Sequence, residues 1–223
     1  MSAGGSSAPA ILWDLDGTLV DSEPLHEQAL VATLEDEGIA PPDDLHGQLL
    51  GLGAPAIHAL FRSRFGIRRD YAAWLQRRWA VYLERAPSLR ARPGALQAFE
   101  AAQALGWQQA VVSNSNRVVV DANLAAIGLA GRLTVIVAAE DVSRPKPDPQ
   151  AYRLAQQRLA PRPAAFLAVE DSATGARAAL AAGCRTFFWP QSPQAAPPGA
   201  VFVADDGASL QAALVQGAGL PLA

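Results

Sequence analysis

The sequence predicts an α/β protein in which a parallel sheet is interrupted by a large helical insertion. Short apolar runs bounded by polar residues or turn signals recur along the chain, as buried strands do. From residue 93 onward these runs alternate with helix-like stretches, which is the order expected for a parallel sheet covered by helices on both faces. Residues 22–90 break the alternation, because they contain helical patterns and no good strand candidate.

The expected strands are short runs rich in β-branched and aromatic residues. They cover residues 10–15, 109–113, 133–138, 165–169, 185–189 and 200–204. The helices between them have recognisable ends, since Asp148 is a good N-cap followed by Pro149 as a first helical residue, and Gly183 is a helix-ending glycine. These helices are expected over residues 93–105, 116–127, 148–159 and 174–182.

The helical insertion is longer than an ordinary loop between two strands. Apolar residues recur at helical spacing within residues 25–34, 54–65 and 71–86. We therefore expect two domains: a core formed by residues 1–20 and 91–223, and a helical domain formed by residues 21–90.

Composition excludes several classes of protein. Of the 223 residues, 50% are hydrophobic and 17% are charged, with a net charge of −3, so we expect neither disorder nor a nucleic-acid partner. There is no run of apolar residues long enough for a membrane span, and the first ten residues lack the basic and apolar segments of a secretory signal. The single cysteine, Cys184, excludes an internal disulfide and fits a reducing compartment, so we expect a cytoplasmic location.

Two aspartates end the first expected strand, in the segment Asp14-Leu15-Asp16-Gly17-Thr18. Residues i and i+2 of a strand face the same way, about 6.6 Å apart along the chain. Ligands of parallel sheets bind beyond the carboxyl ends of the strands, and two neighbouring carboxylates there repel unless a cation or proton stabilises them. The pair suits Mg²⁺, although each aspartate taken alone is also compatible with a turn or capping role.

Two later strands also end in polar residues. Ser113 and Asn114 follow the 109–113 run directly before a helix, where a hydroxyl and backbone amides can hold an anion or form a plain N-cap. Glu170 and Asp171 end the 165–169 run, and an N-cap role explains Ser172 but not two acids at the end of an apolar strand.

The chain has 17 arginines and a single lysine, Lys146. Where either cation would serve, this chain uses Arg, so the one Lys suggests a position that needs a compact ammonium group. Three prolines surround it in Arg144-Pro145-Lys146-Pro147-Asp148-Pro149 and restrict the backbone on both sides. Lys146 is therefore a candidate for a fixed functional position, the alternative being an ordinary surface loop.

The order of these groups resembles the four motifs of the haloacid dehalogenase-like (HAD) phosphohydrolases. The match consists of the DLDGT segment, then Ser113, then Lys146, then the Glu170-Asp171 pair, and it covers nearly the whole chain. The opening DLDGTLVDSEPLH and the later VEDSATGARAALAAG look like the branch of beta-phosphoglucomutase and phosphoglycolate phosphatase. The resemblance implies an α/β fold with a Rossmann-like parallel sheet core, the HAD fold, and an inserted four-helix cap.

The resemblance also implies a mechanism. Asp14 would be the nucleophile that forms an aspartyl phosphate, and Asp16 the acid that protonates the leaving oxygen and then activates water. Ser113, the amide of Asn114 and Lys146 would hold the phosphoryl oxygens.

A Mg²⁺ ion is the implied cofactor. It would bind Asp14, the backbone carbonyl of Asp16, and Asp171, with Glu170 as a ligand either directly or through water. The other implied substrate-binding residues are Thr18 and His26.

The branch is decided by smaller features. His26 occupies the place where beta-phosphoglucomutases have a His that helps to position the acid–base Asp, although an ordinary polar helix residue is also possible there. The mutases usually have Val or a similar apolar residue where this chain has Thr18, which is the commoner phosphatase choice.

The cap also lacks two cations that the mutases use for a second phosphate. Residues 51–54 match the turn that carries their Arg, yet the position is Ala54, and this cap has no lysine. Arg77 or Arg78 is a possible substitute, so a phosphosugar mutase remains the alternative to a phosphatase.

Other classes fit less well. Haloacid dehalogenases generally lack the second acid, which is present here as Asp16. Phosphonoacetaldehyde hydrolases need a cap lysine, and the only lysine is Lys146. A non-enzymatic phospho-acceptor of the receiver type would be shorter and would have no helical insertion after its first strand.

The substrate is the least determined feature. We expect a small phosphorylated metabolite: a sugar phosphate, a sugar acid phosphate or phosphoglycolate. Six arginines make the cap locally basic, which suits an anionic substrate or a solvated surface; they are Arg62, Arg64, Arg68, Arg69, Arg77 and Arg78. No nucleic-acid or membrane partner is expected, and the protein is expected to be a monomer or a homodimer.

Overall fold

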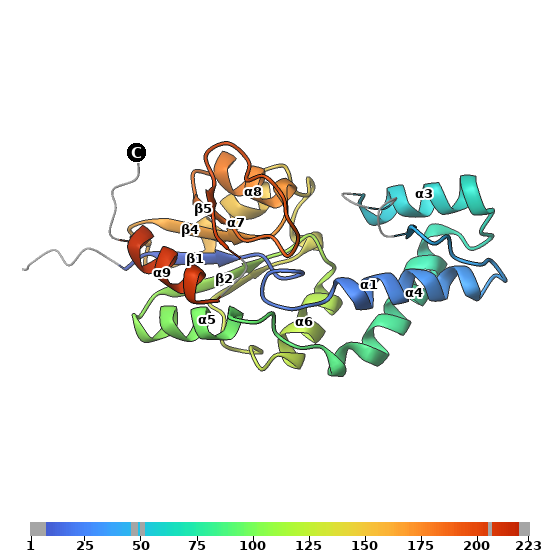
Figure 1. Cartoon of the computed structure of the whole chain (residues 1–223), viewed down its shortest axis with the longest axis horizontal. Coiled ribbons are helices and arrows are strands. Elements are labelled where there is room, and N and C mark those ends of the chain that lie inside the picture. Colours follow the sequence, from blue (N-terminus) through green and yellow to red (C-terminus); the bar gives the residue numbers. More distant parts are fainter. Residues whose placement is uncertain (1–7, 46–48, 50–51, 205–206, 219–223) are drawn as a thin grey trace, which may run out of the picture. The chain divides into compact units, whose positions relative to one another are not determined.

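The computed structural model of the chain describes residues 8–45, 49, 52–204 and 207–218. The chain divides into two compact units (Figure 1). One consists of Met1–Asp21 with Arg90–Ala223, and the other of Ser22–Leu89. The first seven residues, in the segment where no secretory signal is expected, and Gly51 of the expected cap turn lie outside the described part.

The first unit is built on one six-stranded sheet in which all neighbours run parallel. Its spatial order is β3-β2-β1-β4-β5-β6. The strands are β1 Ala10–Trp13, β2 Gln108–Val112, β3 Val135–Val137, β4 Phe166–Glu170, β5 Arg185–Phe188 and β6 Val201–Phe202. The predicted parallel α/β core is thereby confirmed.

The strand order defines where a ligand binds. From β1 the chain proceeds outward through β2 and β3, and then returns to β4 on the other side of β1. The direction of the connections therefore reverses between β1 and β4, and open parallel sheets bind ligands beyond the carboxyl ends of the strands at such a point. Trp13, the last residue of β1, pairs with Val111 of β2 on one side and Val169 of β4 on the other.

Helices cover both faces of this sheet (Figure 1). α7 (Gln150–Arg158) and α8 (Ala173–Ala181) pack on one face, and α5 (Ala95–Ala104) and α9 (Gly207–Ala218) pack together on the other. α6 (Arg117–Ala126) connects β2 to β3. The buried core between sheet and helices consists of small and branched side chains, among them Leu12, Ala110, Val112, Ala155, Ala168 and Ala178.

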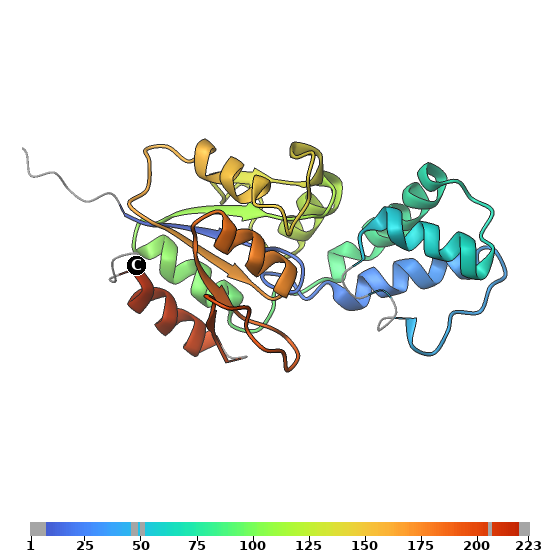
Figure 2. The same cartoon turned by 90° about the horizontal axis from the view of Figure 1, so that it is seen from above.

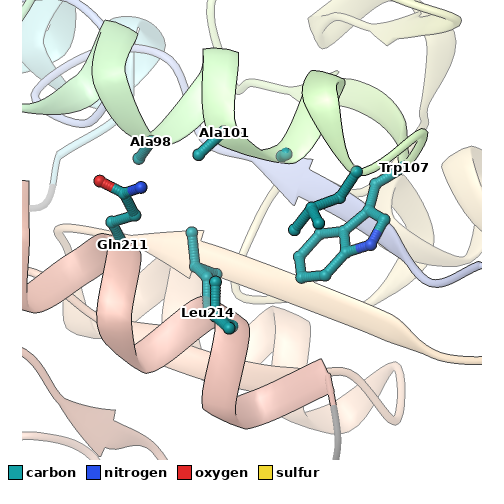
Figure 3. Close-up of a pocket in the computed structure, with 8 residues that line it drawn as sticks. Ala98, Ala101, Trp107, Gln211 and Leu214 are labelled. Atoms are coloured by element: carbon teal, nitrogen blue, oxygen red, sulfur yellow. The ribbon is translucent and has the colours of Figure 1, made fainter.

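The helix α9, which the local sequence pattern does not predict, packs against small side chains of α5. Figure 3 shows Ala98 and Ala101 of α5 facing Gln211 and Leu214 of α9, with Trp107 at one end of the contact. A Cβ on Gly94 would lie 2.1 Å from the Cα of Gly207, so glycine is required where the two helices begin.

Two local expectations need correction. The N-cap of α7 is Pro149 rather than Asp148, although the Asp148 carboxylate still accepts a hydrogen bond from the Gln150 N–H at 2.9 Å. Because Pro149 has no N–H, the first amide that the Asp148 carboxylate can cap is that of Gln150, where the helix begins. The outer strands β3 and β6 are also shorter than predicted; each lies at an edge of the sheet and has a neighbouring strand on one side only.

Among its described residues the second unit contains helices, turns and loops but no strand. It contains α1 (Glu23–Glu35), α3 (Ala54–Phe65), α4 (Tyr71–Arg85) and the short 3₁₀ turn η1 (Ala86–Ser88). α1 and α4 lie side by side, as Figure 2 shows. The expected cap has four α-helices, and the remaining stretch around residues 46–51 falls largely outside the described part of the chain.

The core of the second unit centres on Trp74 of α4, which is fully buried. Its indole N–H donates to the Thr33 hydroxyl of α1 at 3.0 Å, and its ring meets Phe61 of α3 edge-on. The unit therefore has a hydrophobic core of its own. In the ranges that the structure describes, none of the helices combines the length and apolarity needed to cross a membrane.

Candidate active site

The carboxyl ends of β1 and β4 bring three acids together. Asp14 directly follows β1, and its N–H donates to the Val169 carbonyl of β4 at 3.0 Å. Glu170 is the last residue of β4, and Asp171 follows it. One carboxylate oxygen from each of Asp14, Glu170 and Asp171 lies within 4.8 Å of the others.

Two glycines make room for these carboxylates. A Cβ on Gly17 would lie 2.2 Å from an Asp171 oxygen, and Gly17 also adopts a positive φ of 77°. A Cβ on Gly175, in the first turn of α8, would lie 2.0 Å from a Glu170 oxygen. Neither position can carry a side chain without displacing an acid of the cluster.

Lys146 is the cation of the cluster. Its Nζ lies 2.6 Å from Oδ1 of Asp14 and 2.6 Å from Oε1 of Glu170, and the residue is only 6% exposed. The Tyr152 hydroxyl of α7 donates to the same Glu170 oxygen at 2.5 Å. Lys146 therefore lies in the interior of the site rather than on the surface loop that was its alternative interpretation.

The loop that carries Lys146 is held by Asn114. The Lys146 N–H donates to Oδ1 of Asn114 at 3.0 Å, and the Asn114 side-chain amide donates back to the Lys146 carbonyl at 3.4 Å. The Asn114 side chain thus links the end of β2 to the lysine loop. The backbone N–H of Asn114 is the group that the sequence predicts for phosphoryl binding, and that role stays a prediction.

The charges of the cluster shift its pKa values. Burial raises the pKa of Asp14 well above its ordinary value, the charges of Glu170 and Asp171 raise it further, and Lys146 opposes them. Burial by itself would lower the pKa of Lys146, yet the charges of Asp14 and Glu170 outweigh it and raise that pKa. The ammonium is therefore firmly protonated, and the acids remain in excess of it.

Asp16 is held by groups other than those around Asp14. β1 ends at Trp13, so the two aspartates do not continue one strand, and Asp16 lies in the turn that follows. Its Oδ2 accepts from the Ser115 hydroxyl at 2.7 Å, and its Oδ1 accepts from the Asn123 side-chain amide at 2.8 Å.

Ser113 and Thr18 also point at carboxylates. The Ser113 hydroxyl lies 3.4 Å from Oδ2 of Asp16 and accepts from the Ser115 N–H at 2.9 Å. The Thr18 hydroxyl is fully buried, 3.3 Å from Asp14 and 3.4 Å from Asp171. Thr18 thus contacts the acid cluster itself, and its predicted contact with substrate stays a prediction.

Sequence reasoning missed four residues that organise this region. Ser115, Asn123 and Tyr152 hold acids of the site. The fourth, Arg92, is buried and donates to the carbonyls of Gly17 and Trp189 at 2.9 and 2.6 Å, while its guanidinium stacks on the Trp189 ring. Serine in a loop and asparagine or tyrosine in a helix are common in purely structural roles, so the sequence does not distinguish these residues. Burial of an arginine and an asparagine is unusual, but it is visible only in the structure.

His26, the remaining predicted residue, belongs to the second unit. It stacks on Tyr82 with ring centroids 4.5 Å apart, and its Nδ1 lies 3.4 Å from Nη2 of Arg78. Its predicted action on Asp16 stays a prediction.

Of the two arginines considered as cap cations, Arg77 is paired. It donates to both carboxylate oxygens of Asp36, the shorter contact being 2.5 Å. Asp36 also forms an ion pair with Arg69.

Acids at the ends of the central strands of a parallel sheet, with hydroxyls and a loop lysine beside them, are the arrangement expected of a hydrolase of the HAD type. The family model for haloacid dehalogenase-like hydrolases matches residues 8–183. The chain belongs to this family, and to its branch of phosphoglycolate phosphatase and beta-phosphoglucomutase-like proteins. The predicted enzyme class, a HAD-like phosphoric monoester hydrolase, is thereby confirmed.

Several relatives are similar over most of their length. Hexitol phosphatase A of Escherichia coli (strain K12) is 35% identical over 177 residues, covering 78% of this chain and 79% of that protein. Phosphoglycolate phosphatase of Rhodospirillum rubrum is 33% identical over 216 residues, covering 90% and 88%. The crystal structure of CbbY from Rhodobacter sphaeroides in complex with phosphate is 28% identical, with a TM-score of 0.82 over 91% of this chain and 96% of that one.

Proposed function

We propose that this protein is a Mg²⁺-dependent phosphatase that hydrolyses a small phosphomonoester through an aspartyl phosphate on Asp14. The observation that carries the proposal is the contact of the Lys146 ammonium with Asp14, 2.6 Å away, inside a cluster of three acids. A capping or turn role for Asp14 would require neither a buried lysine nor two further acids. A nucleophilic carboxylate requires both a fixed orientation and nearby positive charge.

The residues of the chain divide the work. An oxygen of Asp14 attacks phosphorus while the bond to the leaving oxygen breaks, and Lys146 orients Asp14 and balances charge on the phosphoryl oxygens. Asp16 gives a proton to the leaving oxygen and later takes one from the water that hydrolyses the aspartyl phosphate. Ser113 and the N–H of Asn114, at the end of β2, bind phosphoryl oxygens.

The acids fit a magnesium ion. Carboxylate oxygens are the ligands that this ion prefers, and three clustered carboxylates facing one ammonium leave an excess of negative charge. We propose Asp14, Asp171 and the backbone carbonyl of Asp16 as ligands, with Glu170 contributing directly or through water because Lys146 and Tyr152 already donate to its Oε1. The ion, when bound, would neutralise charge between the phosphoryl group and the attacking carboxylate.

The names of the relatives indicate the class of substrate. Their names specify a hexitol phosphate and phosphoglycolate as substrates of those proteins. We propose a phosphorylated sugar, sugar acid or glycolate as the substrate of this chain. The basic residues of the cap are consistent with an anionic substrate, although Arg77 is paired with Asp36.

A panel of phosphorylated metabolites tests the proposal. The protein with Mg²⁺ should release free phosphate from at least one small sugar, sugar acid or glycolate phosphate, and from p-nitrophenyl phosphate. Absence of turnover on every substrate, with the protein folded, would contradict it and favour a non-enzymatic phospho-acceptor.

Product analysis distinguishes the phosphatase from the mutase. With beta-glucose 1-phosphate and a trace of glucose 1,6-bisphosphate, a phosphatase releases free phosphate, whereas a mutase accumulates glucose 6-phosphate. We expect free phosphate, because Ala54 stands where the mutases carry an arginine and Arg77 is held by Asp36. Rapid formation of glucose 6-phosphate with little free phosphate would establish the mutase instead.

A further inference from the structure

Asn123 is a polar side chain on the buried face of α6. It is fully buried, and its neighbours on that face are the apolar residues Val119, Val120 and Leu124. Burying an amide costs free energy unless it finds a hydrogen-bond partner. Its side-chain nitrogen donates to Oδ1 of Asp16 at 2.8 Å, across 107 positions of the sequence.

The two oxygens of Asp16 have different surroundings. Oδ1 accepts from the Asn123 amide, whereas Oδ2 is shared by the hydroxyls of Ser115 and Ser113 at 2.7 and 3.4 Å. A hydroxyl can rotate to donate or accept, but an amide N–H can only donate. Oδ1 is thus the anchored oxygen, and Oδ2 lies beside Ser113, the hydroxyl proposed to bind the phosphoryl group.

We infer that Asn123 is a positioning residue that holds Asp16 by Oδ1 and presents Oδ2 as the oxygen that transfers the proton. The inference rests on the proposed function, in which Asp16 is the general acid and base. The proton passes from Oδ2 to the leaving oxygen as the P–O bond breaks, and Oδ2 recovers one from the water that hydrolyses the aspartyl phosphate. A hydrogen bond from Asn123 to one oxygen of Asp16 fixes the position of the other oxygen to within a fraction of an ångström, which catalysis requires.

Leaving-group dependence tests this role. A p-nitrophenolate leaves readily without a proton, but an alkoxide needs one, so a misplaced acid slows alkyl phosphates selectively. In Asn123→Leu, which keeps the buried volume and removes the donor, we expect kcat/KM for glycerol 2-phosphate or the best substrate of the metabolite panel to fall by about 10- to 100-fold. We compare kcat/KM because it covers only the steps up to formation of the aspartyl phosphate, whereas kcat also includes its hydrolysis, which is the same for every substrate. For p-nitrophenyl phosphate we expect kcat/KM to fall by no more than about threefold, because its leaving group needs little acid catalysis.

The matched control is Leu124→Ala, which damages packing at the adjacent buried position of α6 without touching Asp16. It should lower the thermal unfolding midpoint and leave the ratio of the two kcat/KM values unchanged. Asp16→Asn should show the same selectivity as Asn123→Leu, and adding Asn123→Leu to it should cost little more, because both changes act through one carboxylate. If Asn123→Leu does not fold, the same two substrates are compared with Asn123→Ala.

Equal losses of kcat/KM on both substrates, or the same selectivity in Leu124→Ala, would overturn the inference and make Asn123 a structural residue. Full additivity with Asp16→Asn would do the same. A wild-type protein that hydrolyses neither substrate would instead overturn the proposed function, and the inference with it.

Discussion

The ammonium nitrogen of Lys146 lies 2.6 Å from the Oδ1 oxygen of Asp14, and both side chains are largely buried. The contact joins a loop after β3 to the end of β1, across 132 positions of the sequence. Since Lys146 is the only lysine among 18 basic residues, the site uses the one compact cation of the chain.

Replacing this lysine by arginine should therefore be damaging. Lys146→Arg keeps the charge, but the larger forked guanidinium would displace Asp14 or the phosphoryl group, and misplacement of about 1 Å can cost ~10²-fold in rate. Steady-state kinetics with the best substrate measure the effect as a fall in kcat.

The control is the reverse exchange in the same loop, Arg144→Lys, at an exposed position that forms an ion pair with Asp148. It should leave kcat unchanged. Near-normal kinetics of Lys146→Arg would show that the ammonium is not needed at Asp14.

Asp14→Asn should abolish turnover without unfolding the protein. The amide is a poor nucleophile, so we expect less than a tenth of the wild-type rate on every substrate. Because burial and the neighbouring acids raise the pKa of Asp14, the folded state disfavours its ionised form, and stability from this group is lost as the pH rises through its folded pKa.

At neutral pH, a neutral amide should relieve that cost. The metal-free variant should therefore unfold at a temperature equal to or above that of the metal-free wild type, as measured by circular dichroism in EDTA. A large drop in the midpoint would mean that the Lys146 contact outweighs the repulsion from Glu170 and Asp171.

Metal exchange tests the acid cluster. Activity should disappear in EDTA and return with Mg²⁺, but Ca²⁺ should restore little of it, because Ca²⁺ takes more ligands at longer distances than Mg²⁺ does. The measurement is phosphate release after dialysis against each ion. Equal rates with both ions, or full activity in EDTA, would contradict a magnesium site at Asp14, Glu170 and Asp171.

Cys184 should be unreactive in the folded protein. Burial raises the pKa of its thiol from an ordinary value of 9.0 to about 12, so almost no thiolate is present at pH 8. Iodoacetamide should modify it only on unfolding, which mass spectrometry can follow with and without denaturant.

The stability that Cys184 contributes is complete below the ordinary thiol pKa and is lost as the pH rises toward 12, which amounts to on the order of 1 kcal/mol by pH 10. Cys184→Ala should flatten this part of the pH dependence of the unfolding free energy. Rapid alkylation of the native protein at pH 8 would show that the thiol is accessible and ionised.

The residues that gather at the strand ends can be predicted from the order of amino acids alone. Apolar runs mark buried strands, and the carboxyl ends of parallel strands share one edge, so local patterns suffice to assign Asp14, Ser113 and Glu170 to a common site. The proline-bounded single lysine is recognisable for a similar local reason. α9 and the N-cap of α7 are not, because small-residue helices and proline caps have weak local signals.

The way in which the site is held in place depends instead on the packing of distant segments. Asn123 meets Asp16, Tyr152 meets Glu170 and Arg92 meets Gly17 through contacts between partners that are 107, 18 and 75 positions apart. Hydrophobic periodicity reports which face of a helix is buried, but the carboxylate that a buried amide or phenol reaches depends on how each crossover helix packs on the sheet. The sequence therefore predicts which chemical groups form this site, whereas the positions of those groups depend on how the helices pack on the sheet.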